Sequence, residues 1–191
     1  MTTTVRRILS GVLAGICIAI GAMLYLSVGG IVGAFLFSVG LLCVISEGNM
    51  LFTGQAWKYS GINIIKVLVP VILGNIAGCC LGAWLCSNSL VLGPVCSESA
   101  VTIINSRVAS GWFLTGCLAI PCGFLMTCAV RSRDTIIVVL CVMSFILCGF
   151  PHCIADVFYY FFYGMTAKTT WIYFATIVGN YIGCNLYRVA N

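Results

Sequence analysis

The sequence predicts an all-α integral membrane protein with six transmembrane helices arranged as two inverted three-helix repeats. Three observations support this. Of its 191 residues, 62% are hydrophobic and only 7% are charged, whereas soluble domains carry about 25% charged residues. The apolar residues fall into six runs near the length of about 20 residues that a membrane helix needs. A short Gly-Asn motif occurs twice, once in each half.

The six predicted spans follow the uncharged runs. They are Ile8–Leu26, Ile31–Ser46 continuing to Trp57, Val67–Ser87, Trp112–Val130, Thr135–Phe150 continuing to Tyr163, and Trp171–Tyr187. With the N-terminus inside, only Arg107 and Lys168 fall outside, while the other basic residues stay on the cytoplasmic side, as the positive-inside rule requires. We therefore expect a multi-pass protein of the cell inner (plasma) membrane with both termini cytoplasmic.

Composition also excludes several function classes. So few charges cannot cover a soluble enzyme, and nine scattered basic residues do not form a nucleic-acid-binding surface. Nucleotide-binding and hydrolase motifs do not occur, so we expect neither an enzyme nor a cofactor. The thirteen cysteines are spread along apolar runs without a CxxC pair, which favours reduced thiols over metal ligands. Cys86, just before a predicted loop over Ser87–Ser110, and Cys96, within that loop, remain a possible pair.

The repeated motif divides the chain. Gly74–Cys79 (Gly-Asn-Ile-Ala-Gly-Cys) recurs as Gly179–Cys184 (Gly-Asn-Tyr-Ile-Gly-Cys), in the third and sixth spans. This predicts one transmembrane domain over 1–191, with repeat one over about 8–87 and repeat two over about 112–188. Because three spans is an odd number, the second repeat is inserted upside down. Inverted repeats with broken helices are typical of channels and secondary transporters.

Polar residues interrupt the second and fifth spans. The first break, Ser46–Gly54, contains two glycines and an asparagine, which disfavour helix, and Thr53 can cap a restarting helix whose positive dipole end suits an anion. The alternative is a surface loop. The second break, Gly149–Asp156, contains the only histidine, His152, and Asp156 lies four residues later, on the same face if the helix has restarted.

A histidine within an apolar run is a functional-site hypothesis because an ionisable group is costly in a membrane. The structural alternative is a His152–Asp156 hydrogen bond that only closes the helix break. Glu47 is either a proton relay or a residue at the mouth without a role. The aromatic run Phe158–Tyr163 reads as a membrane-interface belt.

At its two breaks the sequence resembles the formate/nitrite transporter family. The first matching motif is Leu51-Phe52-Thr53-Gly54 after the small-residue-rich helix Ala34–Ser46. The second is Gly149-Phe150-Pro151-His152 followed by Ile154-Ala155-Asp156-Val157-Phe158, and the third is Gly179-Asn180-Tyr181-Ile182-Gly183. The resemblance covers all six spans. The chain departs from the family pattern at Gly123 and Asp156, which replace Asn, and at Pro151, which replaces Glu.

The resemblance implies an aquaporin-like protomer, a homopentamer with one pore per protomer, and passage of small monovalent weak-acid anions such as formate, nitrite, hydrosulfide or lactate. It also implies the pathway residues. These are one apolar constriction at Leu41 and Phe52, another at Phe37 and Phe145, hydrogen bonds from Thr53 and Asn180 beside His152, and Arg107 where relatives often carry an anion-attracting lysine. On composition alone, Phe37, Leu41 and Phe145 indicate packing instead.

The mechanistic hypothesis is proton-coupled or passive flux. Positive charge at Arg107 gathers the anion, His152 supplies a proton, and Asp156 holds the histidine tautomer, so that a neutral acid crosses the constrictions. Two alternatives stay open. Ionised Asp156 and Glu47 could favour a neutral or cationic solute such as ammonia or ammonium, and the chain could be a closed, non-transporting family member. The expected partners are the small solute, the lipid bilayer and further copies of the chain, with no nucleic acid.

Overall fold

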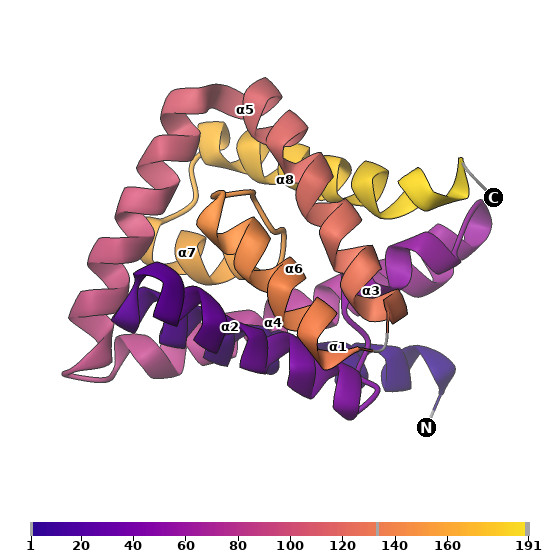
Figure 1. Cartoon of the computed structure of the whole chain (residues 1–191), viewed down its shortest axis with the longest axis horizontal. Coiled ribbons are helices and arrows are strands. Elements are labelled where there is room, and N and C mark those ends of the chain that lie inside the picture. Colours follow the sequence, from indigo (N-terminus) through magenta and orange to yellow (C-terminus); the bar gives the residue numbers. More distant parts are fainter. Residues whose placement is uncertain (1, 133, 190–191) are drawn as a thin grey trace.

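The computed structural model describes residues 2–132 and 134–189, and within these ranges it is all-helical, without a strand (Figure 1). The predicted all-α fold class is confirmed. The helices are α1 (Thr3–Val28), α2 (Gly30–Ser46), α3 (Phe52–Gln55), α4 (Val69–Ser87), α5 (Leu92–Ser132), α6 (Thr135–Leu147), α7 (Ala155–Tyr163) and α8 (Ala167–Asn185). Short turns of 3-10 helix at Ala56–Lys58 and Leu186–Arg188, and a π-helical turn at Ile64–Leu68, complete the order.

The chain leaves the helix at both predicted breaks, and it does so in the same way each time. Gly48 (φ 64°) follows α2 and Gly149 (φ 67°) follows α6. In each case the residue after the glycine donates its N–H five residues back, from Asn49 to the Val44 carbonyl and from Phe150 to the Phe145 carbonyl. This is the Schellman ending of a helix, in which a left-handed glycine turns the chain away from the axis.

The predicted loop Ser87–Ser110 is wrong. From Leu92 onward this segment is helical and forms the first half of α5, which meets the second half at Gly111 (φ 75°, ψ 171°). The polar residues that suggested a loop occupy its outer face. The inner face is periodic, with Cys96, Ala100, Ile104 and Arg107 all buried, which is the spacing of an amphipathic helix. Cys86 and Cys96 are free thiols.

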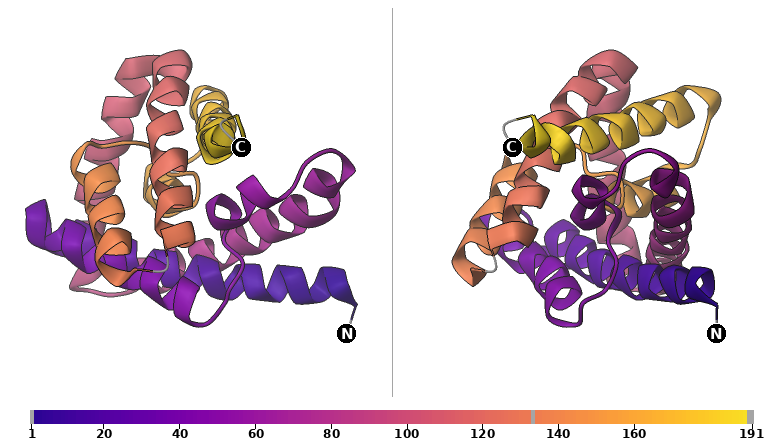
Figure 2. Two further views of the ribbon diagram at one scale, coloured as in Figure 1. Left: turned by 45° about the vertical axis from the view of Figure 1, so that its right-hand side comes forward. Right: turned by 90° about the vertical axis from the view of Figure 1, so that its right-hand side faces the viewer.

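Equivalent helix crossings hold the two halves. α1 crosses α4 where a Cβ on Gly78 would overlap the Val12 carbonyl oxygen, and α5 crosses α8 where a Cβ on Gly183 would overlap the Ile120 carbonyl oxygen. Both glycines belong to the repeated motif, so the motif marks the point of closest backbone approach. Figure 2 shows α8 crossing close to the second half of α5, with α1 at the other side of the molecule. The division into inverted repeats remains a prediction that these crossings support.

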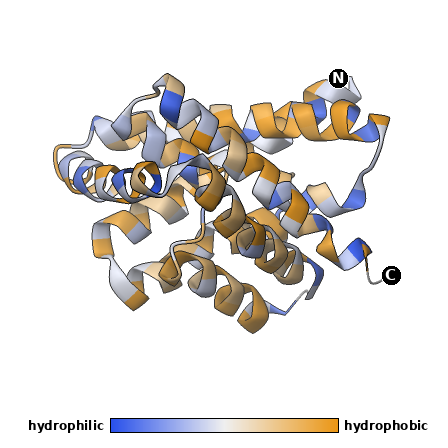
Figure 3. Ribbon diagram, turned by 90° about the horizontal axis from the view of Figure 1, so that it is seen from above, coloured by the Kyte–Doolittle hydropathy of each residue, from blue (hydrophilic) through white to orange (hydrophobic). Residues whose placement is uncertain are grey.

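The exterior is apolar, as a lipid-facing surface must be. Hydrophobic residues colour most of the ribbon in Figure 3, and side chains such as Ile31, Phe113 and Trp171 are more than 60% exposed. Of the helices in the described ranges, three segments are long and apolar enough to cross a membrane: Thr3–Val28, Ile64–Ser87 and Leu92–Ser132. Gly30–Ser46 and Thr135–Leu147 are shorter apolar helices, and the count of six spans remains a prediction.

Candidate functional site

Two buried asparagines hold the two broken segments by the same hydrogen bonds. Asn180 Oδ1 accepts from the Cys153 N–H (2.8 Å), and its Nδ2 donates to the Ala119 and Pro151 carbonyls (2.8 and 2.9 Å). In the other half, Asn75 Oδ1 accepts from the Phe52 N–H (2.8 Å), and its Nδ2 donates to two carbonyls, one on α1 and one in the break (2.9 Å each). Each asparagine therefore anchors a non-helical segment of backbone whose polar groups have no partners within a helix.

These bonds revise the expectation for Asn180. An amide nitrogen has two hydrogens, and in this structure both are used by main-chain carbonyls. The side chain is completely buried and has no donor left for a passing solute. Asn180 is a positioning residue: it fixes Pro151 and Cys153, and with them the residue between, His152.

His152 links the two breaks. It is 1% exposed, and its Nε2 lies 3.1 Å from Oγ1 of Thr53, at the start of α3. Its Nδ1 lies 3.2 Å from the main-chain nitrogen of Ala155, which can only donate. Nδ1 is therefore an acceptor, so the neutral ring carries its hydrogen on Nε2 and donates it to Thr53. The predicted meeting of Thr53 with His152 is present.

Aromatic rings cover one side of the histidine. The Phe145 ring stacks on His152 with centroids 5.5 Å apart, and Phe37 meets Phe145 edge-on at 5.7 Å. Both phenylalanines are 1% exposed and come from helices that end at the two breaks, α2 and α6. The proposed constriction pair is thus in contact. The other pair, Leu41 on α2 and Phe52 on α3, is buried as well.

The predicted position of Arg107 at the mouth and the predicted pairing of Asp156 with the His152 side chain are both wrong. Arg107 does not lie free at a mouth: it is 7% exposed, and its guanidinium forms an ion pair with the Asp156 carboxylate, which is fully buried. The aspartate therefore faces α5, and the bond between residues 152 and 156 runs from the Asp156 N–H to the His152 carbonyl (2.9 Å). Ala155, not Asp156, holds the histidine tautomer.

Sequence reasoning missed the surroundings of this ion pair. The Arg107 guanidinium lies over the ring of Tyr159, 5.6 Å from its centroid. Tyr159 belongs to the run assigned to an aromatic belt, but Phe158, Tyr159 and Tyr160 are at most 3% exposed, so half of the run is core. A usable signal existed, because residue 107 continues the apolar periodicity of its helix. A basic residue in such a position needs a buried acid.

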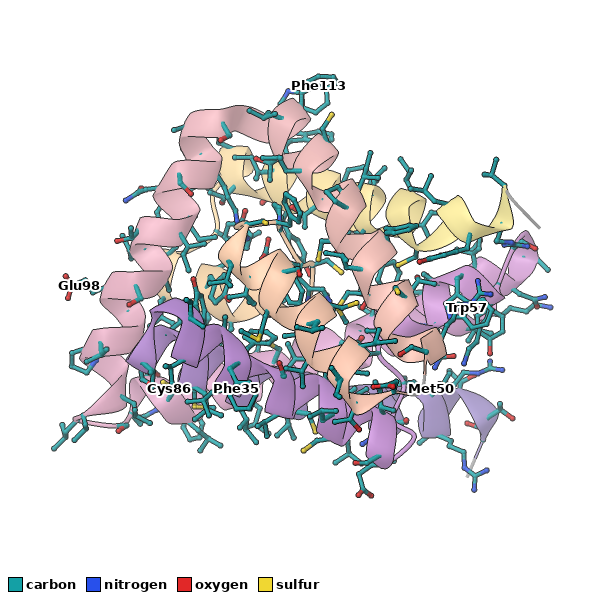
Figure 4. All side chains as sticks on the ribbon, in the orientation of Figure 1. Phe35, Met50, Trp57, Cys86, Glu98 and Phe113 are labelled. Carbon is teal, nitrogen blue, oxygen red and sulfur yellow. The ribbon has the colours of Figure 1, made fainter. Side chains whose placement is uncertain are left out.

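A small cavity joins the ion pair to the histidine. Its volume is about 40 Å³, and Arg107, Asp156, His152, Phe145 and Tyr159 contribute to its lining. The other acids lie elsewhere. Glu98, on the same helix as Arg107, points away from the molecule (Figure 4), and Glu47 is exposed at the end of α2. A larger apolar hollow of about 650 Å³ lies between the second half of α5 and α8, apart from these residues.

Comparisons with known proteins agree with this architecture. A family model described as "Formate/nitrite transporter" matches residues 1–189. A curated relative named "Formate-nitrite transporter", from Plasmodium knowlesi (strain H), is 27% identical over 93% of this chain and 71% of its own length. A "Formate channel FocA" from Haemophilus influenzae is 25% identical over 78% of this chain, which spans 63% of that relative.

Solved structures share the fold at lower identity. A "Pentameric formate channel with formate bound" superposes with a TM-score of 0.78 at 18% identity, covering 98% of this chain and 95% of that one. An "FNT family ion channel" gives a TM-score of 0.79 at 18% identity, covering 99% and 91%. Together with the family match over residues 1–189 and the apolar helices, the shared fold identifies a multi-pass membrane protein.

Proposed function

Because this chain belongs to the formate/nitrite transporter family, we propose that it is a channel or transporter for small monovalent weak-acid anions of the formate, nitrite and hydrosulfide type. Its role is transport, not catalysis. The observation that carries the proposal is the buried polar centre. There His152 donates to Thr53, its ring is covered by the ring of Phe145, and the Arg107–Asp156 pair lies beside it. Polar and ionisable groups at such depth in an apolar bundle are costly, and they typically mark the pathway of a solute or ion.

The energetics favour crossing as the neutral acid. Moving an isolated ion into an apolar medium costs tens of kcal/mol in idealised estimates, and Phe37 and Phe145 form an apolar contact at the centre. A protonated acid avoids most of this cost. In the proposed pathway Phe37 with Phe145 and Leu41 with Phe52 are the constrictions that exclude the hydrated ion.

The hydrogen-bond pattern favours one role for His152 over another. The Nε2–H that now points to Thr53 can turn to a solute oxygen, which makes the pair a donor site for the permeating acid. Acting as a proton donor would require a second hydrogen on Nδ1, and this atom already accepts from Ala155. We therefore propose a hydrogen-bonding role for His152 and Thr53, and a positioning role for Asn180.

The solved relative described as pentameric and the relatives named as transporters and channels lead us to propose a homopentamer in the inner (plasma) membrane, with both termini cytoplasmic. The ammonium alternative depended on ionised acids facing the pathway. Arg107 neutralises Asp156 and Glu47 is exposed, so we do not propose it.

Formate uptake into proteoliposomes across an external pH series tests the function, with empty liposomes as the baseline. We expect protein-dependent uptake that rises as the pH falls. Thr53→Val keeps the shape but removes the hydroxyl beside His152, and it should reduce uptake; Thr170→Val, on the exposed face of α8, is the matched control. No protein-dependent uptake at any pH would contradict the proposal and favour a closed family member.

A further inference from the structure

The buried Arg107–Asp156 pair resembles a carboxylate-binding site that is already occupied. A guanidinium presents a planar fork of donors that suits a carboxylate, and here the carboxylate comes from the chain itself. The pair borders the cavity that reaches His152, so a small solute in this cavity would contact the ion pair as well as the histidine. One carboxylate oxygen, Asp156 Oδ1, has no hydrogen-bond partner within the described ranges although it is buried.

The guanidinium does not depend on Asp156 alone for its place. It lies over the Tyr159 ring, a cation–π arrangement that holds a positive charge. Its helix is held by three fully buried residues on the same face, Cys96, Ala100 and Ile104. If Asp156 became neutral, the positive charge would remain buried beside the cavity and would need another anion.

We propose that Asp156 is a built-in occupant of an anion site on Arg107, and that a weak acid enters by exchanging places with it. The undissociated acid transfers its proton to Asp156: the O–H bond of the acid breaks, and an O–H bond forms on Oδ1. The resulting anion then pairs with the Arg107 guanidinium, which stays protonated throughout. The site is neutral before and after, and the reverse step releases the acid. This inference deepens the proposed function and depends on it.

Asp156 is the group best placed to take the proton. Both nitrogens of His152 are engaged, one accepting from Ala155 and one donating to Thr53. The other ionisable side chains around Asp156 are tyrosines and cysteines. They cannot accept the proton in their neutral forms, and their ionisation would add negative charge in a buried site. They are Tyr25 on α1, Cys79 on α4, Cys122 on the second half of α5, Cys153 in the break, Tyr159 and Tyr160 on α7, and Tyr173 on α8.

The exchange sets a specificity. A weak acid that enters in its protonated form, such as formic acid, supplies the proton for Asp156 and leaves the site neutral. Nitrate, the anion of a strong acid, brings none, and pairing it with Arg107 would leave Asp156 charged and unpaired in a buried site, which is strongly unfavourable. The chain should therefore discriminate between two small monovalent anions by their basicity more than by their size.

Infrared spectroscopy of the protein in liposomes tests the exchange directly. The chain has two aspartates, Asp134 and Asp156, and Asp134 is an exposed cap of α6, where asparagine caps equally well. In Asp134→Asn protein carrying ¹³C-carboxyl aspartate, formate added at constant pH should produce the band of a protonated carboxyl, and nitrate at equal concentration should not. A band already present without formate, or no band with saturating formate, would overturn the proposal.

Flux measurements give a second test. Asp156→Asn frees Arg107, so nitrate uptake should rise by about tenfold, the equivalent of one charge-assisted hydrogen bond, and formate uptake should lose much of its dependence on pH. Glu47→Gln removes an exposed acid and is the control. If Asp156→Asn matches this control for both anions, the exchange is wrong. If it does not fold, the labelled Asp134→Asn protein decides.

The two proposals fail separately. Formate uptake by the wild-type chain without the carboxyl band would preserve the transport function and overturn the exchange. The band without uptake would support the exchange at Arg107 and contradict transport.

Discussion

Replacing Asn180 by alanine tests whether one side chain fixes the second break. The substitution removes three hydrogen bonds, one from the Cys153 N–H and two to main-chain carbonyls. Side-chain hydrogen bonds in a membrane protein contribute on average about 0.6 kcal/mol each, so three give about 2 kcal/mol. The Cys153 N–H, left buried without an acceptor, adds a penalty of about 1–3 kcal/mol. We expect Asn180→Ala to lower the free energy of unfolding by about 3–5 kcal/mol.

Unfolding by SDS in mixed micelles, followed by circular dichroism, measures this loss. Asn185→Ala is the matched control, because it lies on the same helix, is half-buried, and donates its shortest bond within that helix, to the Tyr181 carbonyl (2.8 Å). Asn75→Ala should cost about as much as Asn180→Ala, since it also makes three bonds. An Asn180→Ala protein no less stable than Asn185→Ala would refute the anchoring role.

Three further changes test the crossing, the ion pair and the histidine. Gly183→Ala should prevent folding of the α5–α8 pair, because its Cβ would overlap a carbonyl oxygen of α5. A Cβ on Gly116 would come no closer than 3.3 Å to any atom of Ala175 on α8, so Gly116→Ala should be tolerated. Expression and gel filtration distinguish the two variants. Arg107→Gln should cost about 3–5 kcal/mol, because it leaves Asp156 buried and unpaired, and adding Asp156→Asn should recover part of this in the same SDS titration. His152→Phe should lower formate uptake by about tenfold through the lost donor and leave the residual uptake dependent on pH. Uptake that became independent of pH would instead make His152 the proton-transferring group.

Much of the fold could be predicted because the membrane restricts it. Apolar runs must be helices, and irregular backbone must be anchored by protein, so the repeated Gly-Asn motif marked both the closest crossings and the anchors. The first half of α5 could not be found in this way. Only one of its faces is buried, and a polar outer face gives the same composition as a loop.

The site was predicted less completely than the fold. The meeting of Thr53, His152, Phe37 and Phe145 came from resemblance to a family, not from periodicity. The ion pair was missed because Arg107 lies on the helix that precedes the second repeat, whereas Asp156 lies at the break within that repeat. No local pattern relates a helix before Gly111 to the start of α7. Spacing suggested a nearer partner for Asp156, but a helical i, i+4 relation requires both residues to be in the helix, and α7 begins only at Ala155.

The equivalent anchors explain how a nearly symmetric fold supports an asymmetric site. Asn75 and Asn180 each hold the residues on either side of one position, which is Leu51 in the first break and His152 in the second. The first anchor thus fixes an apolar side chain and the second an imidazole. Both side chains are 1% exposed, so the two breaks provide equally buried positions. Thr53 from the first break then completes the hydrogen bond of His152, and the polar centre needs both halves although its ionisable groups all come from the second half and the helix that precedes it.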